Sequence, residues 1–192
     1  MKFKNILLTT VASLSLAACI TTTASQYTAS TNNVLLIQSV MSDVSSKLSV
    51  QDITVADGLD VTPRCRLVGG LDIGATQTVP AYMTEAFRAE FFTSGSYDVN
   101  AETILQVKLT SFNFNSFDGR WELGIDVSSP FSGGYHVDYI HNFSSSYFAG
   151  NACQNGADAF GPAVAKLIEQ VVINPEFKKL FPAKAPKATP AE

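Results

Sequence analysis

The stretch that decides the fold runs from Leu105 to Phe143 and reads LQVKLTSFNFNSFDGRWELGIDVSSPFSGGYHVDYIHNF. Apolar side chains occupy every second position in three parts of it. The parts are separated by Asp118-Gly119 and by the turn residues Ser128 to Gly134. A period of two is typical of a strand with one buried face, and an Asp-Gly pair between strands favours a hairpin. The stretch therefore predicts a three-strand antiparallel meander with one face in the core.

The alternation slips once within the first of these strands. After Leu105, Val107 and Leu109, the apolar positions move to Phe112 and Phe114. An extra residue in one strand of a pair produces such a slip. We therefore expect a β-bulge near Thr110-Ser111.

The segments before the meander predict helices and strands in alternation. Spacings of three and four favour a helix over 34–48, although Val34 to Ile37 fit the start of a strand equally well. β-rich composition favours a strand over 49–56, and a second strand over 64–73 is interrupted by Gly69-Gly70. The clearest helix is 79–94, whose inward side is apolar except for Glu90. Pro80 is tolerated in its first turn, and Gly95 supplies its end.

After the meander, apolar residues at helical spacing predict a last helix over 156–173. The order is then β-β-α-β-β-β-α, with the helix over 34–48 in front. Strands in a group with helices segregated to one side make an α+β fold. We expect an antiparallel sheet with the helices packed on one face.

Length and composition limit both the number of domains and the class of function. The chain has 192 residues, 46% of them hydrophobic, which is enough for one domain with a core. A net charge of −4 without any block of like charge argues against nucleic-acid binding. Residues 19–33 are rich in Thr and Ser, and 182–192 in Pro, Ala and Lys, so we expect a flexible tether and a disordered tail around a single domain at 34–181.

The amino terminus has the features of a targeting segment. Lys2 and Lys4 precede an apolar run too short to span a membrane, which leads to Leu16-Ala17-Ala18-Cys19. This box resembles that of bacterial lipoprotein signal peptides. The resemblance implies removal of 1–18 by cleavage between Ala18 and Cys19, and acylation of Cys19. In enterobacterial lipoproteins an Asp directly after the acylated Cys resembles an inner-membrane retention signal. This chain has Ile20 at that position, so we expect an outer-membrane location facing the periplasm. An ordinary secretory signal cut after Ala18 is the alternative.

The count of cysteines predicts a disulfide. With Cys19 acylated, Cys65 and Cys153 are the remaining pair in an oxidising compartment. Neither has a second Cys or a His at metal-site spacing. A catalytic cysteine is the other interpretation, but the pattern suggests no partner histidine.

Other chemical motifs are weak. His136 and Asp138 share one face of a strand whereas His141 points to the other, so they do not converge on a metal. Ser144 to Ser146 lack the nucleophile elbow of hydrolases. The glycines at Gly69 to Gly74 follow no nucleotide-binding spacing. We therefore predict no cofactor, no metal and no catalytic activity.

The aromatic residues suggest a surface for a partner. Phe131 lies in a turn, and Tyr147 and Phe148 break the alternation, whereas we expect most of the other aromatic residues of this region in the core. Exposed aromatic residues suit an interface with another protein.

The element order and the box together resemble small envelope lipoproteins that serve as auxiliary subunits of transport or secretion systems, including the curli-assembly type. The expected function is a non-catalytic accessory module, held on the bilayer by acylated Cys19 and bound to an envelope protein. The alternatives are a binder of an apolar ligand or lipid, and an envelope hydrolase.

Overall fold

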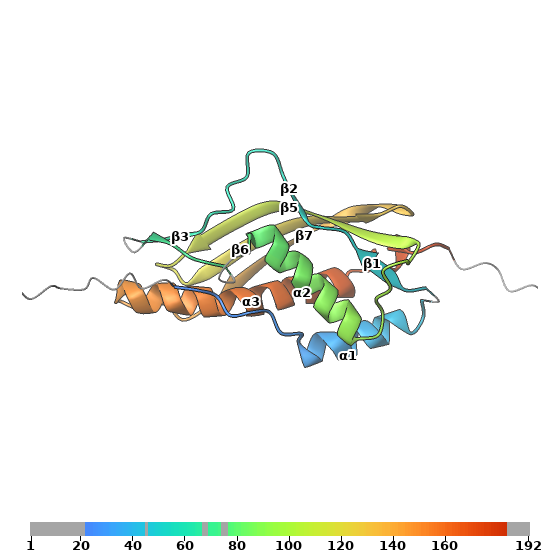
Figure 1. Ribbon diagram of the computed structural model, residues 1–192, viewed down its shortest axis with the longest axis horizontal. Coiled ribbons are helices and arrows are strands. Elements are labelled where there is room, and N and C mark those ends of the chain that lie inside the picture. The colour runs from blue at the N-terminus through green and yellow to red at the C-terminus, as the bar shows by residue number, and fades with distance from the viewer. Residues whose placement is uncertain (1–21, 45, 67–68, 74–76, 184–192) are drawn as a thin grey trace, which may run out of the picture.

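The computed structural model describes residues 22–44, 46–66, 69–73 and 77–183. It shows an α+β fold, as predicted (Figure 1). In chain order the elements are α1 (Thr31–Met41), β1 (Leu48–Val50), β2 (Thr54–Val55), β3 (Arg64–Cys65), β4 (Gly69–Gly70), α2 (Val79–Thr93), β5 (Thr103–Asn115), β6 (Arg120–Ser129), β7 (Ser132–Asn142), α3 (Ala149–Ile173) and a final 3-10 turn, η1 (Phe177–Leu180).

The three-strand meander is confirmed. β5, β6 and β7 pair antiparallel in that order, and the β5–β6 register shifts between Leu109 and Ser111, where a bulge was expected. The buried face follows the alternation, because Trp121, Leu123 and Ile125 are all at most 2% exposed. The sequence pattern of these strands therefore determined their pairing and their orientation.

The sheet is mixed, which corrects the prediction of a purely antiparallel one. β1 and β2 both pair parallel to β5, on the edge opposite β6. The helix α2 intervenes between them and β5, and a connection through a helix returns the chain in the same direction. The predicted strand 49–56 is also broken in two, because Ile53 turns its backbone N–H to the Thr84 hydroxyl of α2, 2.9 Å away.

The prediction that residues 64–73 form a second strand of the main sheet is wrong. Its residues form the small antiparallel pair β3–β4, in which Cys65 lies opposite Gly69. Gly69 has φ +115°, in the region that favours glycine. The glycine pair therefore belongs to a local hairpin.

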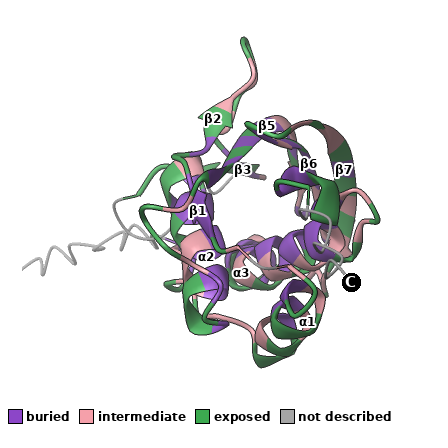
Figure 2. Ribbon diagram, turned by 90° about the vertical axis from the view of Figure 1, so that its right-hand side faces the viewer, coloured by how far each residue is buried: buried purple, intermediate pink, exposed green. Residues whose placement is uncertain are grey.

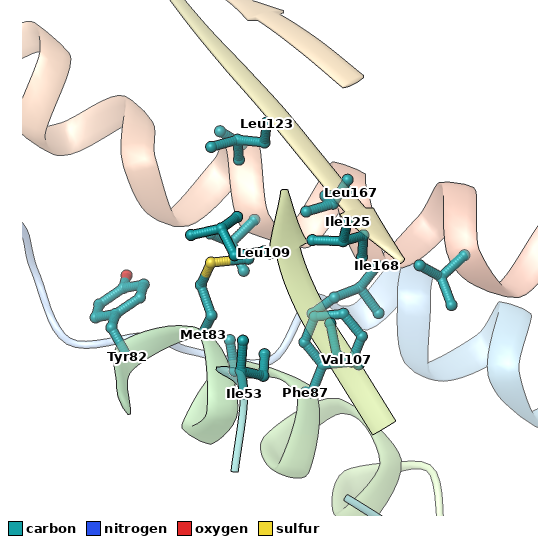
Figure 3. Packing of buried hydrophobic residues seen from close by; sticks show 14 of the residues in the cluster. Ile53, Tyr82, Met83, Phe87, Val107, Leu109, Leu123, Ile125, Leu167 and Ile168 are labelled. Atoms are coloured by element: carbon teal, nitrogen blue, oxygen red, sulfur yellow. The ribbon is translucent and has the colours of Figure 1, made fainter. Parts of the chain in front are cut away.

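The helices cover one face of the sheet, as predicted, but in two layers. α3 packs on β6 and β7, and α2 packs on β1, whereas α1 packs on α2 and α3. Figure 2 shows the sheet arching over α3, with α1 beneath. Buried side chains of the sheet, α2 and α3 meet between them, among them Leu109, Met83 and Leu167 (Figure 3). Burying each such side chain stabilises the fold by about 1.5–3 kcal/mol.

The helix α3 begins at Ala149 rather than near residue 156. Tertiary contacts support this extra portion, whose glycines and asparagines are poor helix formers. Asn155 Nδ2 donates to the Ser144 carbonyl at 2.7 Å, and the Trp121 indole N–H donates to the Gly156 carbonyl at 2.9 Å. A Cβ at Gly156 would lie 2.5 Å from the Phe114 ring, so glycine permits the helix to approach β5.

The prediction of a flexible tether is wrong for residues 22–33. Thr22 and Ala24 are buried, and the backbone of this segment exchanges hydrogen bonds with Asp72 at 2.8 and 3.0 Å. The helix α1 then starts at Thr31, earlier than residue 34. Composition predicted a flexible tether because the segment has little apolar surface of its own to bury. The segment is folded because polar partners in the domain hold it. Residues 19–21 and 184–192, covering the rest of the predicted tether and most of the predicted tail, lie outside the described residues.

Candidate functional site

A pocket lies between residues 25–33, α2, α3 and β7. Its volume is about 430 Å³, within the range of small-molecule sites. The rings of Tyr27 and Tyr82 and small residues of α3, such as Ala165, give it an apolar lining, and His141 and Lys166 add polar groups. The segment predicted as a tether therefore forms one wall of a candidate ligand site.

A buried carboxylate holds that wall in place. Glu90 of α2 is fully buried, and its Oε1 accepts hydrogen bonds from the Tyr27 hydroxyl, the Ser30 backbone N–H at 3.0 Å and Asn33 Nδ2 at 3.1 Å. Burial and the neighbouring carboxylate raise the pKa of Tyr27. Glu90 was the single polar residue on the inward side of the predicted helix. Its partners show that it fastens the amino-terminal segment to the domain.

His141 in the pocket is not part of an assembled catalytic triad. Burial lowers the pKa of His141, and the nearby Lys166 lowers it further. Lys166 pairs with Glu169 at 2.6 Å. Among the described residues, no hydrogen bond joins His141 to a serine or a carboxylate. The pocket has the volume to enclose a small ligand, and His141 contributes a polar group to its lining.

His136 lies on the opposite face of β7, as predicted. Its two ring nitrogens contact Asp126 at 2.7 Å and Asp138 at 3.0 Å, and hydrogen bonds to these carboxylates raise the pKa of His136. Within the described ranges, no group of at least three His, Cys, Asp or Glu residues could hold a metal ion. This cluster is a surface ion pair.

The predicted pair Cys65–Cys153 is bonded in the structure. The S–S distance is 2.07 Å, the Cα atoms are 5.7 Å apart, and both residues are buried. The bond fastens the β3–β4 hairpin to the beginning of α3. Cys19 and Ala18 lie outside the described residues.

The central serine of the run Ser144 to Ser146 has a structural role. The Ser145 hydroxyl donates to the Ser116 carbonyl and accepts from the Arg66 guanidinium at 3.1 Å. These bonds connect the loop before α3 to the β5–β6 turn. The Ser145 hydroxyl is therefore held by a carbonyl and a guanidinium group.

The three aromatic residues predicted for a partner surface are exposed but lie at two ends of the molecule. Phe131 is 44% exposed in the turn between β6 and β7, whereas Tyr147 and Phe148 are 94% and 70% exposed just before α3. Figure 1 places these segments at opposite ends of the meander. The predicted surface is therefore two separate surfaces.

The end before α3 holds a further exposed aromatic residue. Phe117 is 72% exposed beside the Asp118-Gly119 turn, and the Arg66 guanidinium lies 4.5 Å from its ring centroid. Arg66 also donates to the Ser116 carbonyl at 2.8 Å and to the Tyr147 carbonyl at 3.3 Å. We call Phe117, Tyr147, Phe148 and Arg66 the aromatic end. The position of Phe117 next to a turn signal was the clue to its exposure.

Comparisons of the chain with protein-family models, with curated proteins and with solved structures found no match. Among the described helices, none combines the length and the apolar character needed to cross a membrane.

Proposed function

We propose that the protein is a lipid-anchored accessory module of the bacterial cell envelope, without catalytic activity of its own. Leu16-Ala17-Ala18-Cys19 after a basic, apolar leader is the observation that carries the proposal. The structure adds a supporting point: because Cys65 and Cys153 are bonded to each other, Cys19 is the one cysteine of the three left for acylation. Stable anchoring takes more than one acyl chain, which the lipoprotein modification supplies.

Mass spectrometry of the protein extracted from membranes tests the anchor. The amino-terminal peptide should begin at Cys19 and carry acyl mass, and Cys19→Ser should leave the chain unprocessed or release it from the membrane. A peptide beginning at Cys19 without added mass would contradict the proposal. Ile20→Asp tests the location, because it should retain the acylated protein in the inner membrane.

The turn that holds Phe131 is the candidate contact with an envelope partner. The ring is partly exposed, while the backbone N–H of Phe131 donates to the Ser129 hydroxyl at 3.1 Å, which in turn donates to the Leu180 carbonyl at 2.6 Å. The turn is thus fixed to the domain and presents an aromatic side chain. Aromatic residues are enriched in the cores of interfaces.

Crosslinking in intact envelopes tests this contact. Phe131→Ala should leave the melting temperature nearly unchanged and reduce recovery of the crosslinked partner. Phe92→Ala is the matched control, since Phe92 is a 72% exposed phenylalanine on α2. Equal recovery with the two variants would remove Phe131 from the interface.

Binding of an apolar ligand is a second candidate function, and the pocket of about 430 Å³ favours it. An acyl chain suits the aromatic and small side chains of its lining. Titration with a fluorescent fatty acid measures this binding. Ala165→Trp should fill the pocket and weaken binding by about tenfold, whereas Ile104→Trp, at a partly exposed position on β5, should not. Equal affinities for both variants would argue against the pocket.

A further inference from the structure

The first described residues are fastened to one end of the domain. Thr22 is 2% exposed, and its carbonyl accepts from the Asp72 N–H at 3.0 Å, while the Ala24 N–H donates back to Asp72 at 2.8 Å. Asp72 follows the β3–β4 hairpin closely in the chain. The point at which the chain enters the domain is therefore fixed by backbone hydrogen bonds.

The distance from this point to the anchor is limited by covalent geometry. Cys19 precedes Thr22 by three residues. A fully extended chain spans at most about 3.6 Å per residue, so the two Cα atoms are separated by about 11 Å or less in any conformation. An acylated Cys19 therefore holds the Thr22 end of the domain close to the bilayer surface.

The aromatic end lies at this same end of the molecule. A short series of contacts connects it to Thr22: the Leu71 N–H donates to the Pro63 carbonyl at 2.9 Å, Cys65 is bonded to Cys153 in α3, and Arg66 donates to the Tyr147 carbonyl. Figure 1 shows the first described residues (dark blue), β3, the start of α3 and the β5–β6 turn towards one end. The β6–β7 turn and the last described residues lie towards the other.

The side chains of the aromatic end suit the boundary between lipid and water. Three rings are 70–94% exposed, and Tyr147 packs edge-on against Phe148 with centroids 5.8 Å apart. Aromatic side chains are enriched at the headgroup level of membranes, and arginine can place its stem along apolar surface while its charge stays in water. The nearby Asp118 carboxylate does not oppose contact with the membrane, because its charge has polar partners. It accepts a hydrogen bond from Asn115 Nδ2 at 2.7 Å and lies 3.9 Å from the Arg120 guanidinium.

We infer that the aromatic end is a second membrane contact, which inserts Phe117, Tyr147 and Phe148 into the interface of the leaflet that holds acylated Cys19. The inference rests on the proposed lipidation. It assigns Tyr147 and Phe148 to lipid and leaves Phe131 for a protein partner. The domain then has a fixed orientation, with the β6–β7 turn directed away from the membrane.

Depth-dependent fluorescence quenching tests this orientation. The full-length acylated protein is reconstituted into vesicles of phosphatidylcholine brominated near the carbonyl end of the acyl chains. Phe148→Trp and Phe117→Trp each add one indole to the aromatic end, and Phe131→Trp adds one to the opposite end as the matched control. The wild type supplies the background of Trp121, which is buried. The added fluorescence should fall by about half in the first two variants and remain nearly unchanged in the control, since only the aromatic end meets the interface.

The outcomes separate the inference from the proposed function. If mass spectrometry finds acylated protein on the vesicles while Phe148→Trp and Phe117→Trp are quenched no more than Phe131→Trp, the inference is wrong and the lipoprotein proposal stands. If Cys19 carries no acyl chain, both are wrong. A melting temperature equal to that of the wild type shows that each variant is folded.

Discussion

Removal of the Cys65–Cys153 bond should destabilise the domain strongly. The bonded residues are 88 positions apart, so the bond removes many conformations from the unfolded chain. In the chain-entropy model a loop of this length contributes about 4–5 kcal/mol. Because single domains are stable by about 5–15 kcal/mol, the loss would be a large fraction of the total. Both cysteines are buried, so alanine substitution is a cleaner perturbation than a reducing agent.

The measurement is urea unfolding of the double variant Cys65→Ala, Cys153→Ala, followed by circular dichroism and Trp121 fluorescence. With an m-value of about 2 kcal/mol/M, the midpoint should fall by about 2 M. The matched control is Cys19→Ser, which removes the proposed anchor but leaves the Cys65–Cys153 bond intact. Its midpoint should equal that of the wild type when all variants are unfolded in the same detergent solution. Hydrogen exchange should rise first in the opening turns of α3 and in β3, which the bond joins.

A midpoint shift below about 0.5 M would refute this reasoning, because it corresponds to only about 1 kcal/mol. The unfolded chain would then already be compact around this pair of residues. Equal loss of stability in Cys19→Ser would also refute it, since that change leaves the loop closed.

Three further changes test the packing. Glu90→Ala should cost about 2–4 kcal/mol by leaving buried donors unpaired, and Glu90→Gln, which keeps an acceptor, should cost less; equal urea midpoints would contradict this role. Burial raises the pKa of Tyr82 from its ordinary value of 10 to about 12, so the unfolded state loses this proton first. Stability should therefore fall between pH 10 and 12 by up to about 1.4 kcal/mol per pH unit, and less in Tyr82→Phe, as urea unfolding across this range would show. Gly134 has φ +87°, and a Cβ there would lie 1.7 Å from the Val127 carbonyl oxygen. Gly134→Ala should cost about 3 kcal/mol or more in thermal unfolding, whereas Gly133→Ala, in open space, should cost little.

Sequence patterns predicted best where burial imposes a period. The alternation from Leu105 to Phe143 predicted the meander, its bulge and its buried face, because each side of a strand meets either the core or water. The inward side of α2 was recognised for the same reason. The even number of cysteines left after Cys19 predicted the bonded pair, since parity depends on count and compartment alone.

The predictions from sequence were wrong where long-range contacts override the local conformational preference of the residues. Residues 22–33 have the composition of a linker, yet they are folded because distant residues bind them. Glu90 accepts hydrogen bonds from this segment, and the backbone of Asp72 exchanges hydrogen bonds with it. The glycine-rich beginning of α3 is helical because Cys65 and Trp121 hold it. No local pattern contains these partners.

The sequence by itself therefore determined the class of fold, the meander and the cysteine pair. Only the tertiary structure decided that β1 and β2 run parallel to β5, that a pocket lies under residues 25–33, and that Phe131 is separated from Tyr147 and Phe148. The physical reason is that periodicity records which side of an element is buried. It does not record which distant element covers that side, and the sites of this protein are formed by such distant pairs.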